Sequence, residues 1–82
     1  MNSIRKGGIL NFELNKEDER LEIHGDREGL MSFAKLLIEM INNNSQHRHL
    51  MTKSWGGEEL TEDLIGKDNE LINHVKIFYW SR

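Results

Sequence analysis

The chain has 82 residues, of which 30% are charged and none is cysteine, and its formal net charge is −3. A chain of this length forms one small domain that buries only about 60% of its unfolded surface, so a deep catalytic cleft is not expected. The lack of cysteine excludes disulfides, thiolate metal sites and cysteine nucleophiles, and it is typical of the reducing cytoplasm. The acidic balance argues against direct nucleic-acid binding, and no apolar run approaches the roughly 18 residues that a membrane span needs.

Two segments near the N-terminus predict a β-hairpin. In residues 9–15 the apolar positions are every second residue, and the same alternation recurs in residues 20–24. A period of two is typical of a strand with one buried face. The short polar connection between the two segments favours antiparallel pairing.

Residues 27–43 predict one long helix that begins after Asp26, a good N-cap residue. Its inward stripe is expected to contain six apolar residues at helical spacing: Leu30, Phe33, Ala34, Leu37, Met40 and Ile41. The asparagines that follow end the helix, because asparagine tolerates the left-handed conformation. The apolar surface is wider than one sheet face needs, so a structural homodimer is one alternative for this chain.

Two further strands are expected at residues 47–52 and 73–80, where apolar and polar residues alternate again. The resulting order is ββαββ, within a single domain over residues 1–82. We therefore predict an α+β fold in which an antiparallel four-stranded sheet packs one face against the helix.

Alternation assigns every histidine to the sheet face that points away from the helix, and we expect that face to be open. Imidazoles on one face, with Glu13 and Glu22 nearby, are potential ligands of zinc or a similar ion. The alternative is that they are ordinary solvated strand residues, and no metal or other cofactor is favoured. A small metal-binding or regulatory module is thus a second interpretation, and its ligands would be His24, His47, His49 and His74.

The segment from Glu58 to Glu70 contains six acidic residues and a single basic one, Lys67. Such a segment is either simply solvated or steers a basic partner protein towards it. Exposed aromatic residues at the end of the last strand are typical anchors of protein contacts. No catalytic residues are expected, and the predicted partner-binding residues are Glu58, Glu59, Glu62, Asp63, Phe78 and Trp80.

Several short segments occur in a characteristic order: Leu21–Asp26, Glu28–Leu30, the apolar helix, His47–Leu50, Trp55–Leu60 and Asn73–Ile77. This ordered set resembles the immunity protein 32 family of bacterial polymorphic toxin systems. The resemblance implies a protein that binds and neutralises a toxin encoded next to it, often a nuclease. It implies no enzymatic activity and assigns no binding residues.

Overall fold

The computed structural model describes residues 8–82, and residues 1–7 of the expected domain lie outside the described part. Among the described residues, no helix is both long enough and apolar enough to cross a membrane. The elements in chain order are β1 (Leu10–Asn15), β2 (Arg20–Gly25), α1 (Arg27–Asn42), β3 (His47–Met51), the short 3-10 helix η1 (Lys53–Trp55), β4 (Glu70–Ile72) and β5 (His74–Phe78).

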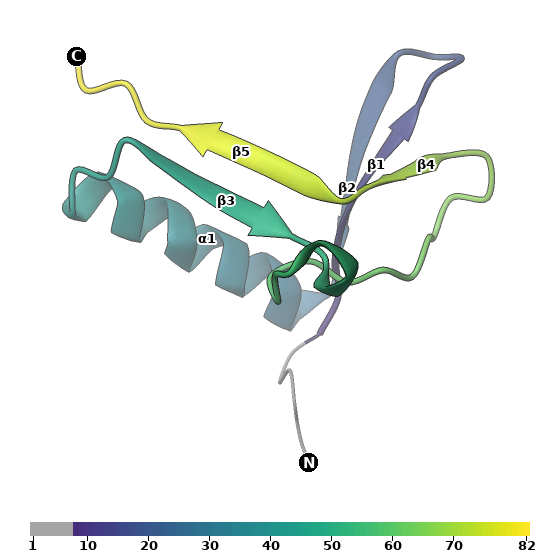
Figure 1. Ribbon diagram of the computed structural model, residues 1–82, viewed down its shortest axis with the longest axis horizontal. Helices are drawn as coiled ribbons and strands as arrows, with labels where there is room; N and C mark the ends of the chain where they lie inside the picture. Colours follow the sequence, from purple (N-terminus) through teal and green to yellow (C-terminus); the bar gives the residue numbers. More distant parts are fainter. Residues whose placement is uncertain (1–7) are drawn as a thin grey trace.

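The strands form two antiparallel sheets, with strand orders β2-β1-β4 and β3-β5 (Figure 1). The predicted α+β class with a long helix and antiparallel pairing is confirmed, but the single four-stranded sheet is wrong. The sequence-based prediction missed β4, because three residues are too few to show an alternating pattern. This strand pairs with β1, whereas β5 pairs with β3, so the chain passes from one sheet to the other at Asn73.

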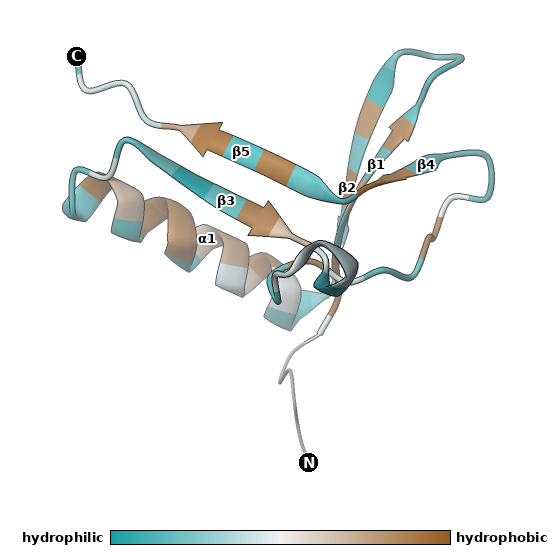
Figure 2. Cartoon of the chain, viewed as in Figure 1, coloured by the Kyte–Doolittle hydropathy of each residue, from teal (hydrophilic) through white to brown (hydrophobic). Residues whose placement is uncertain are grey.

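The core lies where α1 meets both sheets. Its buried members come from β1, α1, β3 and the segment after η1: Leu10, Phe12, Leu36, Met40, Leu50 and Leu60. Phe12 of β1 and Phe33 of α1 pack edge to face, with ring centroids 5.6 Å apart. Apolar and polar residues alternate along β5, which contributes Val75 and Ile77 to this core (Figure 2).

Helix α1 begins at its predicted N-cap, since the Asp26 carboxylate accepts a hydrogen bond from the Gly29 amide at 2.9 Å. The same oxygen accepts a hydrogen bond from the Ile9 amide at 3.0 Å, which ties the helix to the start of β1. The helix ends as expected among asparagines, and Asn44 adopts a positive φ of 54°.

The inward face of α1 differs from the predicted stripe. Of the predicted stripe, Met40 is buried and Phe33 and Leu37 pack against the core, whereas Leu30, Ala34 and Ile41 are exposed. The other buried residues of this helix are Gly29 and Leu36. The physical reason is the approach of Gly29 to β1: a Cβ atom at this position would lie 1.7 Å from the Ile9 carbonyl oxygen. Because the glycine face contacts the strand, the helix turns part of its apolar surface outward.

The expectation of an open face opposite the helix is wrong for β1. Asn11 and Glu13 point to that face, and both are fully buried. The segment of residues 61–69 covers them, because Asn11 donates a hydrogen bond to the Asp63 carbonyl and the Ile65 amide donates one to Glu13. A long polar loop therefore acts as a second layer on this sheet.

Candidate functional site

A groove rimmed by carboxylates lies between the N-terminal half of α1 and the segment after η1. Its volume is about 660 Å³, and its acidic lining residues are Glu28, Glu58, Glu59, Glu62 and Asp63. Lys53 is the one basic residue among the described residues that line it. Phe33, Leu50 and Leu60 are among its apolar lining residues. The structure thus brings together all four acidic residues predicted to bind a partner.

Two of these carboxylates are held in place by the backbone. One Glu59 oxygen accepts a hydrogen bond from the Met51 amide at 3.0 Å, and one Glu62 oxygen accepts a hydrogen bond from the Ser54 amide at 2.7 Å. Hydrogen bonding by Ser54 lowers the pKa of the Glu62 carboxyl. The negative charge of the groove is therefore positioned by the turn around η1 and not only by flexible side chains.

The two predicted aromatic contacts lie elsewhere. Phe78 and Trp80 border a smaller depression of about 400 Å³, together with His47 and Tyr79. Trp80 is 73% exposed. Phe78 pairs with His47 at one end of the β3–β5 sheet, whereas the groove adjoins the other end, where Glu59 contacts Met51. The structure does not bring the acidic and aromatic residues into one site.

The histidines also divide into two places. His47, His49 and His74 are exposed on the same outer face of the β3–β5 sheet, whereas His24 lies on β2 in the other sheet. The four-histidine site considered from the sequence is therefore wrong as a single site. Within the outer face, Nδ1 of His49 lies 2.8 Å from Nε2 of His74.

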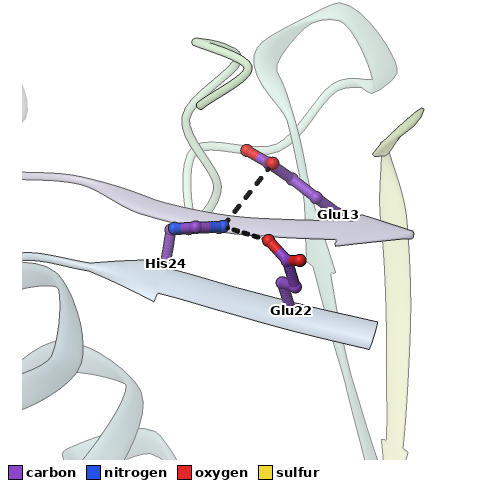
Figure 3. A group of neighbouring side chains, drawn as sticks. All are labelled: Glu13, Glu22 and His24. Carbon is purple, nitrogen blue, oxygen red and sulfur yellow. Dashed lines mark hydrogen bonds and ion pairs between the residues drawn. The ribbon is translucent and has the colours of Figure 1, made fainter. Parts of the chain in front are cut away.

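His24 instead belongs to a polar cluster with Glu13 and Glu22 (Figure 3). Its Nε2 atom lies 2.8 Å from a Glu22 oxygen and 3.6 Å from a Glu13 oxygen. One ligand atom from each of the three residues falls within 4.8 Å of the others. These residue types can bind a cation. Whether they do so here depends on whether the carboxylate oxygens are free or already accept hydrogen bonds.

Those carboxylates already have donors. The Asn69 side-chain amide donates to Glu13 at 2.9 Å and to Glu22 at 3.0 Å, so it bridges the two oxygens that a cation would share. Glu13 also accepts hydrogen bonds from the Ile65 and Gly66 amides at 2.8 and 2.9 Å. The cluster is therefore a satisfied network that anchors the 61–69 segment, and it does not present free metal ligands.

The network changes the ionisation of both acids. Burial alone raises the pKa of Glu13, but hydrogen bonds from Asn69, Ile65 and Gly66 together lower it below its ordinary value. Hydrogen bonds with His24, Arg20 and Asn69 lower the pKa of Glu22 to about 2. Both carboxylates are consequently ionised at neutral pH, where they accept these hydrogen bonds at full strength.

We expect acid to weaken the fold through Glu22. Its folded pKa of about 2 lies below the ordinary value of 4.5, so its contribution is complete above pH 4.5 and is lost as the pH falls towards 2. Urea titrations of the wild type and of Glu22→Gln from pH 7 to pH 2 test this. The difference between the two unfolding midpoints is expected to shrink across that range. A difference that stays constant would contradict the proposed linkage.

Sequence reasoning missed the buried role of Glu13 and Asn69. Glu13 occupies a polar position in an alternating strand, which ordinarily indicates a solvent-facing residue. Gly66 was a possible signal of this burial in the sequence. A Cβ atom at this position would lie 2.2 Å from the side-chain amide nitrogen of Asn69. A glycine inside an acidic loop can thus mark close packing of that loop against a strand.

Among known protein families, the model of the family described as Immunity protein 32 matches residues 20–75, which is more than half of the chain. No curated protein and no solved structure matches it.

Proposed function

The chain belongs to the immunity protein 32 family, and from this membership we propose that it binds a bacterial toxin and neutralises it by covering the toxin's active surface. The proposed action needs a complementary surface and no catalytic step. Its place is the cytoplasm of the bacterium that produces the toxin, where a protein without cysteine suits the reducing conditions.

The acid-rimmed groove is the observation that supports a particular docking site. Five carboxylates surround an apolar lining, so the groove suits a partner segment that carries basic residues next to an apolar one. A nuclease meets this description, because enzymes that bind phosphate backbones carry clusters of lysine and arginine. If the groove of this protein covered such a cluster on the nuclease, the nucleic acid could no longer reach it.

Phe78 and Trp80 form a proposed second contact. Exposed tryptophan side chains bury a large apolar area when a partner covers them, and tryptophan is enriched among the residues that dominate binding energy. We assign different kinetic roles to the two contacts. The acidic rim accelerates encounter with a basic partner, whereas the aromatic contact slows dissociation.

The double variant Glu58→Gln with Asp63→Asn tests the groove. We expect its association rate with the toxin encoded beside it to fall about tenfold at low salt, with a smaller salt dependence. The measurement is surface plasmon resonance at several ionic strengths. The matched control is Glu17→Gln with Glu39→Gln, which changes the net charge equally at exposed positions away from the groove residues.

The outcomes separate the site from the function. If association slowed equally in the test and control variants, the groove would not be the docking site. The net charge of the protein alone would then explain the slower association. Absence of toxin binding by the wild type would contradict the function itself. In the same assay, Trp80→Ala is expected to accelerate dissociation and to leave the association rate close to that of the wild type.

A further inference from the structure

Two exposed imidazoles form a close pair on the outer face of the β3–β5 sheet. His49 of β3 lies opposite Lys76, and His74 of β5 lies opposite Met51, so the two histidines are diagonal neighbours across the strand pair. Their rings stack at an interplanar angle of 27°, and Nδ1 of His49 and Nε2 of His74 are hydrogen-bonded to each other at 2.8 Å, with the tautomers deciding which nitrogen donates. Both residues are exposed, so an ion can reach these nitrogens from solvent.

We infer that His49 and His74 form a two-ligand site for a divalent ion of the zinc class. Imidazole nitrogens bind such ions at about 2.0–2.1 Å. With metal–nitrogen bonds of that length, the two nitrogens are about 2.9 Å apart when the nitrogen–metal–nitrogen angle is 90°. They are about 3.3 Å apart when this angle is tetrahedral. The separation of 2.8 Å is close to the first value. Small rotations of the two exposed rings, with loss of the bridging proton, replace the hydrogen bond between them and bring both lone pairs onto one ion. Water fills the remaining positions.

The charges around the pair keep its nitrogens available. Partial desolvation, together with the neighbouring basic side chains of His74, Lys76 and His47, lowers the pKa of His49. A neutral imidazole at neutral pH has the lone pair that a metal needs. The Lys76 ammonium itself lies over the Phe78 ring, 4.9 Å from its centre.

The other histidines do not belong to this site. The His47 ring packs edge to face on the His49 ring, with centroids 5.2 Å apart. However, His47 pairs with Phe78, four residues along β3 from the pair that contains His74, which corresponds to about 13 Å of strand. His24 is held by the Glu22 carboxylate in the other sheet. His24 is therefore the matched control, and replacement of His47 tests whether a third imidazole takes part. The inference stands on the geometry of β3 and β5 alone and does not depend on the proposed function.

Isothermal titration of the protein without a histidine tag, with Zn²⁺ at pH 7.5, tests the site. We expect saturable binding of one ion per chain, at least about tenfold weaker in His49→Gln and in His74→Gln. His47→Gln and His24→Gln should bind as the wild type does. Binding should be weaker at pH 5.5 than at pH 7.5, because protons compete for the same nitrogens. Mg²⁺ should give no binding, since it prefers oxygen ligands.

A fluorescence titration with Cu²⁺ gives an independent readout. The Trp55 ring lies 6.2 Å from the His74 ring, and in the Trp80→Phe variant Trp55 is the one tryptophan of the chain. Cu²⁺ on the pair should quench its emission, and His49→Gln should abolish this quenching. The inference would be overturned if the wild type bound no Zn²⁺ or if His49→Gln bound it as the wild type does. It would also be overturned if His47→Gln or His24→Gln lost binding to the same extent as His49→Gln.

Discussion

Replacement of Glu13 by alanine is expected to lower the free energy of unfolding by about 3 kcal/mol. The Glu13 side chain is fully buried and accepts hydrogen bonds from the Ile65 and Gly66 amides and from Asn69. Removal of the carboxylate leaves these donors without their acceptor beneath the 61–69 segment. For a domain of this size, such a loss is a large part of the total stability.

Urea unfolding followed by circular dichroism measures this loss, and hydrogen exchange locates it. The amides of Ile65 and Gly66 should exchange faster in Glu13→Ala than in the wild type under the same conditions. Glu70→Ala is the control, because Glu70 makes an exposed ion pair with Lys16 at 3.1 Å and should cost at most about 0.5 kcal/mol. If the two variants were equally stable, the anchoring role of Glu13 would be wrong.

Gly29→Ala is expected to cost about 2–3 kcal/mol, although alanine normally stabilises a helix relative to glycine. The new Cβ atom would lie 1.7 Å from the Ile9 carbonyl oxygen, which belongs to the backbone and cannot rotate away. Helix α1 must therefore move from β1, and the hydrogen bond from the Gly29 amide to Asp26 is strained with it.

Thermal unfolding measures the melting temperatures of Gly29→Ala and Ser32→Ala, which place the same substitution at two positions of one helix. Ser32 is exposed, so alanine there should stabilise the protein by a few tenths of a kcal/mol through helix propensity alone. A melting temperature of Gly29→Ala at or above that of the wild type would show that the close approach of α1 to β1 is not required.

Local patterns were sufficient for those elements whose signals lie within a few residues. The hairpin of β1 and β2 follows from alternation on both sides of a short polar connection. Helix α1 follows from its apolar spacing and from Asp26, whose side chain caps it. Membership of the immunity protein 32 family also follows from ordered short segments, and the family match over residues 20–75 confirms it.

The candidate sites depended on contacts between distant parts of the chain. The segment after η1 must fold against α1 to bring four acidic residues around one groove, namely Glu58, Glu59, Glu62 and Asp63. The separation of His24 from the other histidines requires two sheets in place of one. Neither arrangement has a periodic signal, because alternation reports which face a residue occupies and does not report which strands are neighbours.

From its amino-acid sequence alone, this protein is an α+β chain with a long capped helix, a β-hairpin and a recognisable family. Each of these features depends on the backbone preferences and spacing of nearby residues. The tertiary structure alone decided that Glu13 is buried, because its donors at Ile65 and Gly66 are more than 50 residues away. It also decided that β4 and β5 separate into two sheets, because a three-residue strand is defined by its partner and not by its own pattern.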